Sequence, residues 1–157
     1  MHRKQVWTIA MVLIFGGLMF CQPTRAGQCS QSDAAGKFGF TLTGWLILPT
    51  GAVPAAAVGQ AHVDGKGNVT GAEARSVGGG YADETFTGTL TIEDDCTGSM
   101  TLNFSEAGVP VRTSVLSIVL DDNKNEIRMV QKSLTLPNGS VVPVVITADA
   151  KRIVNKD

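Results

Sequence analysis

Alternating runs of residues and turn-forming clusters follow one another at nearly regular intervals through most of this chain. The segment TFTGTLTI (85–92) places Phe86, Leu90 and Ile92 on one side and threonines on the other. A period of two residues is that of a β-strand with one buried face. Clusters such as DGKGN (64–68) supply the Gly and Asn residues that tight hairpin turns require. No long stretch carries the 3.6-residue period of an amphipathic helix.

The number and order of these strands predict the fold. We count about eight strands joined by short turns, and short connections favour pairing between consecutive strands. Closing such a meander removes the unpaired edges that invite aggregation. We therefore predict an all-β domain over 37–157, a single antiparallel meander barrel of about eight strands, with a β-sandwich as the alternative. A barrel of this size is either packed solid or holds one small ligand.

The first 26 residues have the composition of a secretory signal peptide. A basic start (HRK) precedes an uncharged run over 6–20, and small residues fit cleavage after Ala26. The run is shorter than the ~20 apolar residues of a transmembrane helix. Lipidation at Cys21 and an uncleaved anchor are the alternatives. We expect an exported chain, periplasmic or extracellular, in a bacterial host.

Cleavage leaves two cysteines, Cys29 and Cys96. An even pair of cysteines in an exported protein indicates a disulfide, here one that tethers the N-terminal segment 27–36 to the barrel. Closing a loop of this size contributes ~4 kcal/mol in the chain-entropy model. A catalytic thiol is disfavoured, because the acidic run EDD directly before Cys96 would raise the pKa of its thiol.

Cleavage also changes the charge of the chain. Loss of Arg3, Lys4 and Arg25 reduces the 13 basic residues to 10, against 14 acidic residues. Nucleic acid demands a basic face and is therefore not an expected partner. No stable membrane span is expected after cleavage, and no run of Lys or Arg offers a patch for a membrane surface.

Three segments together resemble a known group of proteins. They are GKFGFTLTG (36–44), GNVTGAEARSVGGG (67–80) and TFTGTLTIEDDCTGSMTL (85–102), and their most specific piece is Asp95-Cys96-Thr97-Gly98. The pattern is similar to that of small exported bacterial proteins of unassigned function.

By shape this group resembles calycin-type barrels, the class that holds lipocalins and allene-oxide-cyclase-like or dirigent-like barrels. The resemblance implies a barrel over most of residues 36–153 and assigns no functional residue. The chain departs from lipocalins because Gly44 and Trp45 are adjacent, where lipocalins have Gly-x-Trp, and because the C-terminal KRIVNKD is too short for a packed helix.

Residues able to carry out catalysis are few. His62 is the only histidine of the mature chain and could pair with Asp64 on the same face of a strand, but nothing supplies a nucleophile or a second metal ligand. The run DDNKNE (121–126) begins like a calcium-binding loop but lacks the required Gly and the final Glu. We therefore predict no catalytic residue, no metal and no cofactor, and a binding protein rather than an enzyme.

Several charged residues fall within predicted strands. An interior Arg and Glu beside aromatic rings would suit an amphipathic ligand, but charges on strands ordinarily face solvent, and we expect them outside the barrel. Asp83 and Glu84 are adjacent and point to opposite faces, so they form no acid/base pair. The charged residues so considered are Glu73, Arg75, Arg112, Glu126 and Arg128.

Three functional hypotheses follow. The first is an exported barrel that binds a small apolar or amphipathic ligand, although a solid core filled by the same lining residues is the favoured interpretation of them. The second is a structural or interaction module of the cell envelope, presenting loops 49–56 and 78–83. The third is a cyclase- or isomerase-type enzyme whose barrel shapes a reactive substrate. The candidate lining residues are Phe38, Phe40, Leu42, Trp45, Phe86, Met100, Leu102 and Phe104.

Overall fold

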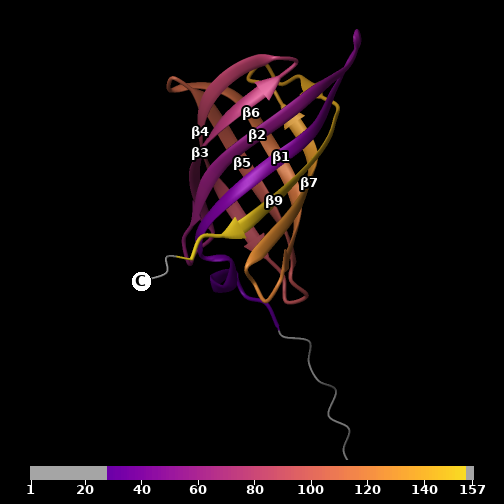
Figure 1. The fold of residues 1–157 in the computed structure, drawn as a ribbon. Helices are drawn as coiled ribbons and strands as arrows, with labels where there is room; N and C mark the ends of the chain where they lie inside the picture. Colours follow the sequence, from indigo (N-terminus) through magenta and orange to yellow (C-terminus); the bar gives the residue numbers. More distant parts are fainter. Residues whose placement is uncertain (1–27, 155–157) are drawn as a thin grey trace, which may run out of the picture.

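The computed structural model describes residues 28–154 and shows a closed antiparallel β-barrel (Figure 1). The predicted signal peptide and the alternative site at Cys21 lie outside the described residues. The elements are η1 (Gln31–Ala34), β1 (Gly36–Leu48), β2 (Gly51–Val63), β3 (Asn68–Val77), β4 (Gly80–Ile92), β5 (Thr97–Glu106), β6 (Val109–Asp121), β7 (Glu126–Thr135), β8 (Val141–Val142) and β9 (Val144–Arg152).

Each long strand pairs with its neighbour in the sequence, and the last returns to the first. Strand β1 pairs with both β2 and β9, while β6 pairs with β7 and β7 with β9, so the eight long strands close on themselves. The two-residue β8 adds only a short pairing to the end of β7. The predicted antiparallel meander barrel of eight strands is confirmed, and the sandwich alternative does not occur.

The two ends of the barrel are distinct in Figure 1. At the lower end lie η1 and the C-terminus of the described chain, and at the upper end the β1–β2 hairpin extends beyond its neighbours. The lower end carries the turns 64–67, 93–96 and 122–125, and the upper end carries the turns 49–50, 78–79 and 107–108 and the loop 136–140.

The upper connections are shorter than the sequence suggested. We predicted loops over 49–56 and 78–83, but strand β2 begins at Gly51 and strand β4 at Gly80. Pro54 fits inside β2 because the pairing of β2 with β3 extends only as far as Ala55. The missing N–H of Pro54 therefore removes no hydrogen bond from that pairing. Most of the residues predicted as interaction loops therefore belong to the barrel wall.

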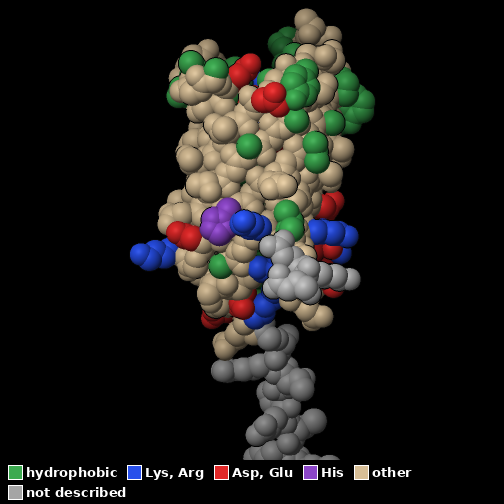
Figure 2. Space-filling view, turned by 60° about the vertical axis from the view of Figure 1, so that its left-hand side comes forward, with side chains coloured by type: hydrophobic (Ala, Val, Ile, Leu, Met, Phe, Trp, Pro, Cys, Tyr) green, Lys and Arg blue, Asp and Glu red, His purple; other side chains and the backbone are tan. Residues whose placement is uncertain are grey.

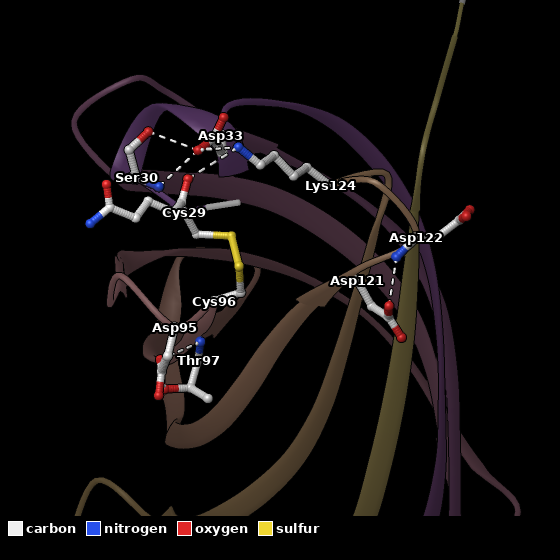
Figure 3. Close-up of a disulfide and its surroundings, with 10 residues drawn as sticks. Cys29, Ser30, Asp33, Asp95, Cys96, Thr97, Asp121, Asp122 and Lys124 are labelled. Atoms are coloured by element: carbon white, nitrogen blue, oxygen red, sulfur yellow. Dashed lines mark hydrogen bonds and ion pairs between the residues drawn. A yellow bond between two sulfur atoms is a disulfide. The ribbon is translucent and has the colours of Figure 1, made fainter. Parts of the chain in front are cut away.

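The N-terminal segment seals the lower end. Cys29 is buried and forms the predicted disulfide with Cys96, which confirms that pairing. Figure 3 shows the bridge beside an ion pair in which Lys124 Nζ lies 2.8 Å from Asp33 Oδ2. Arg152, at the end of the last strand, donates hydrogen bonds to the carbonyl oxygens of Asp33 and Ala35. Covalent, ionic and backbone contacts thus hold the segment against the barrel.

Candidate functional site

Most of the predicted lining residues do face the barrel interior. Their centre is a row of aromatic rings, in which Phe86 lies 5.9 Å from Phe40 and 5.2 Å from Phe104 between ring centroids. The glycines Gly59 and Gly71 make this row possible, because a Cβ at either position would collide with the ring of Phe40 or Phe86. The inward-facing residues of the predicted set are Phe38, Phe40, Leu42, Phe86, Met100, Leu102 and Phe104.

These residues leave little free space between them. The cavity that they line in the lower half of the barrel has a volume of about 60 Å³. That volume has room for a few water molecules and is far below the ~300–1,000 Å³ of ordinary ligand pockets. The lower half of the interior is therefore a packed apolar core.

Trp45 differs from the other predicted lining residues. It lies at an odd position of β1, whereas the inward-facing Phe38, Phe40 and Leu42 lie at even positions, and its side chain is on the outer wall with 49% exposure. Its neighbours across the sheet are Pro54 and Val145. Strand alternation alone separates Trp45 from the interior.

Above the aromatic row lies a layer of charged side chains. Glu73 and Glu84 are directly opposite each other in the pairing of β3 with β4. Arg112 bridges them, with Nη2 2.7 Å from Glu73 Oε1 and Nη1 bonded to Glu84 Oε2. Arg75 Nε donates to Glu84 Oε1 at 2.6 Å. The guanidinium of Arg112 also lies over the ring of Phe104, 3.7 Å from its centroid, and joins the charged layer to the aromatic row.

Two irregularities in the sheet help to build this layer. The pairing of β5 with β6 shifts beside Phe104, and that of β6 with β7 shifts beside Val115. Bulges of this kind re-aim side chains and reverse the alternation beyond them. As a result Val111 and the adjacent Arg112 both line the interior, and Gln131 reaches Ser114 with a hydrogen bond of 3.0 Å.

Burial changes the electrostatics of the two carboxyl groups. The side chains of Glu73 and Glu84 are 1% and 0% exposed. Desolvation raises the pKa of Glu73, and the nearby charge of Glu84 adds to that effect, while Arg112 opposes it. Two carboxylates are tolerated here because two guanidiniums neutralise them.

The prediction that the strand charges face solvent is therefore wrong for part of the set. Glu73, Arg75 and Arg112 lie inside, whereas Arg128 is exposed and pairs with Asp121 and Glu126 near the lower end. Glu84 was missed as an interior residue. Its position two residues before the inward-facing Phe86 on the same strand was the available signal, because residues i and i+2 share a face.

A second, larger cavity opens above the charged layer. Its volume is about 260 Å³, near the lower limit of ligand pockets. The charged layer and Gln131 form its floor, and its walls are apolar. Leu48 and Leu136 stand at its rim and are both partly exposed at the upper end. The wall residues are Leu42, Leu46, Leu48, Ala55, Ala57, Val77, Val111, Leu134, Leu136, Val142 and Ile146.

The other sequence candidates lie apart from this cavity. His62 is exposed near the lower end, and the Asp64 carboxylate instead accepts hydrogen bonds from Lys66 and Asn68 within its own turn. No group of three or more His, Cys, Asp or Glu side chains among residues 28–154 could hold a metal ion. No helix in that same range has the length and hydropathy to cross a membrane.

The outer surface is divided along the barrel. Most of the lysine and arginine side chains visible in Figure 2 lie in its lower part, and hydrophobic side chains gather toward the upper end. Exposed hydrophobic residues of the upper end include Trp45, Ile47, Leu48, Tyr81, Val109, Leu136, Val141 and Val145. Apolar side chains, with acidic ones among them, therefore lie around the end of the barrel at which the larger cavity opens (Figure 2).

The fold is similar to that of designed β-barrels. The redesigned barrel mFAP1, solved bound to DFHBI, has a TM-score of 0.51 and 17% identity, over 78% of this chain and 98% of that chain. EF1p2_mFAP2b, also bound to DFHBI, has a TM-score of 0.56 and 12% identity, over 80% of this chain and all of that chain. The redesigned barrel b11L5F_LGL has a TM-score of 0.51 and 15% identity, over 80% and 96% of the two chains.

At these identities the likeness shows the fold alone. No protein-family model and no curated protein matches the chain. The fold and the site together define a small closed antiparallel barrel with a packed lower core and an amphipathic cavity open at the upper end.

Proposed function

We propose that this protein binds a small amphipathic molecule in the upper cavity of its barrel. The observation that carries the proposal is the combination of apolar walls, a charged floor and an opening at one end of the barrel. Ligand pockets are predominantly apolar with a few placed polar groups, and the mouths of β-barrels are common sites for them. Two of the designed barrels with this fold were solved bound to DFHBI, which supports a barrel interior as a place for a small molecule.

Binding is tested with prodan, a small neutral naphthalene dye whose emission rises and shifts to the blue in an apolar site. Ala57 faces inward between Leu42 and Arg75, so Ala57→Phe fills the cavity and is expected to abolish the dye signal. Val58, the next residue along β2, is exposed and does not line the cavity, so Val58→Phe is the matched control and keeps the signal. Equal signals from both variants, or none from the unmodified protein, would contradict the proposal.

The proposal includes export of the chain. Processing after Ala26 would leave the tethering segment 27–36 and the barrel domain 37–157 in an oxidising compartment, and the Cys29–Cys96 disulfide is compatible with that. A relation to calycin-type exported proteins is part of the same proposal. Mass spectrometry of protein purified without reductant from the exported fraction is expected to give residues 27–157 less two hydrogens. A mass that retains residues 1–26, or two free thiols, would overturn this part.

An interaction module of the cell envelope is the second candidate. The observation that favours it is the exposed apolar surface around Trp45, Ile47 and Val145 on the upper outer wall. Under this alternative, Val145→Lys would disrupt capture of an envelope protein and leave the prodan signal intact. Under the first proposal, no such partner is required for the dye to bind.

A cyclase- or isomerase-type enzyme is the third candidate. It is favoured by the buried carboxyl of Glu73, whose raised pKa is the property of a group that can exchange a proton within a cavity. Turnover of a bound ligand that is lost in Glu73→Gln, with binding retained, would support this candidate over simple binding.

A further inference from the structure

The charged atoms that a ligand meets on the cavity floor are not equally accessible. Both carboxylate oxygens of Glu84 are occupied by guanidinium groups, and its side chain is fully buried. Glu73 is almost as buried, with 1% of its side chain exposed, and Arg112 donates a hydrogen bond to its Oε1. The Arg75 side chain is 25% exposed, and its Nη atoms have no hydrogen-bond partner among residues 28–154. The accessible charge on the floor is therefore positive.

The rim of the cavity offers no competing cation. The segments that form the upper end contain neither Lys nor Arg, while the exposed Glu106 lies in one of them. An anion that enters from the upper end therefore finds its partner only at the floor. The segments concerned are 46–53, 76–82, 105–111 and 133–145.

We propose that the upper cavity binds a small amphipathic monocarboxylate, with its head group on the Nη atoms of Arg75 and its apolar part between the leucines of the rim. This inference rests on the proposed function and specifies its ligand class. A guanidinium can bind a carboxylate through two parallel hydrogen bonds, and charge-assisted bonds of this type are about twice as strong as neutral ones. Apolar contact with Leu46, Leu48 and Leu136 would hold the remainder of the ligand.

Charge balance adds a second consequence. Two arginines and two glutamates make the empty layer neutral when all four are ionised. A bound carboxylate adds one negative charge, which proton uptake by Glu73 offsets. The charged groups facing Glu73 are Arg112 from β6, Glu84 from β4 and Arg75 from its own strand, while β2, β5 and β7 contribute apolar or neutral side chains. Affinity for the carboxylate is therefore expected to rise as pH falls, as long as the ligand itself stays ionised.

The head group is tested by calorimetry with octanoate, 1-octanol and octylammonium, which share one chain and differ in charge. We expect octanoate to bind about tenfold more tightly than octanol, a difference of one charge-assisted hydrogen-bond pair, and octylammonium to bind more weakly than both. This comparison uses the unmodified protein and does not depend on whether a variant folds. Octanoate binding no tighter than octanol, or octylammonium binding tightest, would overturn the inference.

Two variants test whether Arg75 is the source of the preference for octanoate over octanol. Arg75→Gln is expected to lower octanoate affinity to that of octanol on the same variant. Arg128→Gln, on the exposed outer wall, removes the same charge without touching the cavity and keeps the preference. If Arg128→Gln has the same effect as Arg75→Gln, the preference comes from net charge and the assignment to Arg75 fails. Equal binding of octanoate and octanol leaves the cavity as a binding site and removes only the head-group inference, whereas no binding of any probe removes both.

Discussion

The lower and upper ends of this barrel are built from the same strands, but the lower end is sealed and the upper end is open. At the lower end a disulfide, an ion pair and an arginine that bonds to backbone carbonyls hold the N-terminal segment over a packed apolar core. At the upper end the strands surround an open cavity. The charged side chains at its floor are paired mainly with one another. Cross-links and packing are concentrated at the lower end, and the larger cavity lies at the upper end, where the packing stops.

The glutamates and arginines mark the boundary between these two regions. Burying two carboxylates without partners would be costly, and even paired charges are weak evidence for stability. Replacing the layer with leucines would continue the core upward and close the cavity floor. The layer therefore separates the packed lower core from the open upper cavity, which is the proposed binding site.

The largest expected effect comes from opening the lower end. Replacing both Cys29 and Cys96 by Ser is expected to lower the free energy of unfolding by ~4 kcal/mol, because the loop between them is no longer closed in the unfolded chain. Urea unfolding of the oxidised, reduced and doubly substituted proteins measures this loss. Prodan binding at the upper end should persist in folded double-Ser protein. Loss of dye binding with intact folding would show that the two ends are coupled.

Breaking the charged layer is expected to have the next largest effect. Glu84→Ala leaves Arg75 and Arg112 without their shared partner and should cost about 3 kcal/mol of unfolding free energy. The adjacent Asp83 faces outward, and within residues 28–154 the one hydrogen-bond partner of its side chain is the exposed Tyr81, so Asp83→Ala should cost less than ~1 kcal/mol. Similar losses from both variants would mean that the buried layer contributes no more than a surface contact.

Substitutions at the two ends should change the pH dependence of stability in opposite directions. Burial raises the pKa of Glu73 above the ordinary glutamate value of 4.5. The folded protein therefore loses stability as pH rises above 4.5, because the buried carboxyl gives up its proton less readily than it does in the unfolded chain. Glu73→Gln should therefore gain stability relative to the unmodified protein as pH rises from that value toward neutrality. The comparison is made by thermal unfolding across a pH series. A difference between the two proteins that does not change with pH would contradict a raised pKa.

At the lower end the sign is reversed. The hydrogen bond with Lys124 and those with Ser30 lower the pKa of Asp33 to about 2. Its contribution to stability is present above the ordinary value of 3.8 and is lost as pH falls toward 2. Asp33→Asn should therefore be less stable than the unmodified protein at neutral pH and equal to it near pH 2 in the same series. A constant difference would show that this ion pair does not govern the acid sensitivity of the segment.

The smallest expected effect is at Trp45. Because its side chain is on the outer wall, Trp45→Ala should change the free energy of unfolding by no more than about 0.5 kcal/mol and leave prodan binding unchanged. Leu46→Ala, one residue along and facing the cavity, should alter the dye signal. A loss of dye binding in Trp45→Ala would contradict this prediction and indicate that Trp45 contributes to dye binding.

Much of the architecture could be predicted from local patterns. Alternation in segments such as 85–92 predicted strands and their buried faces, and turn residues at 64–68 predicted a hairpin where the structure has one. Counting the cysteines left after the predicted cleavage identified the pair Cys29 and Cys96. These inferences succeeded because strand alternation, turn conformation and disulfide pairing depend on few residues.

The site was harder to predict, because its members come from strands far apart in the sequence. Arg112 lies 39 residues after Glu73 and 28 after Glu84, and only the register of β3, β4, β5 and β6 brings them into one layer. The general preference of charged residues for solvent also pointed the wrong way for Glu73, Arg75 and Arg112. Their mutual neutralisation, which permits burial, is invisible until the partners are known.

The sequence by itself determined that the chain forms a series of antiparallel strands, which faces of those strands are apolar, and which cysteines can pair. Each of these properties is local, since it follows from neighbouring residues or from a count. The tertiary structure alone decided that the interior is divided into a packed lower core and an open upper cavity with a charged floor. The height of an inward side chain within the barrel depends on strand register, bulges and closure, and these are set by pairings between distant segments.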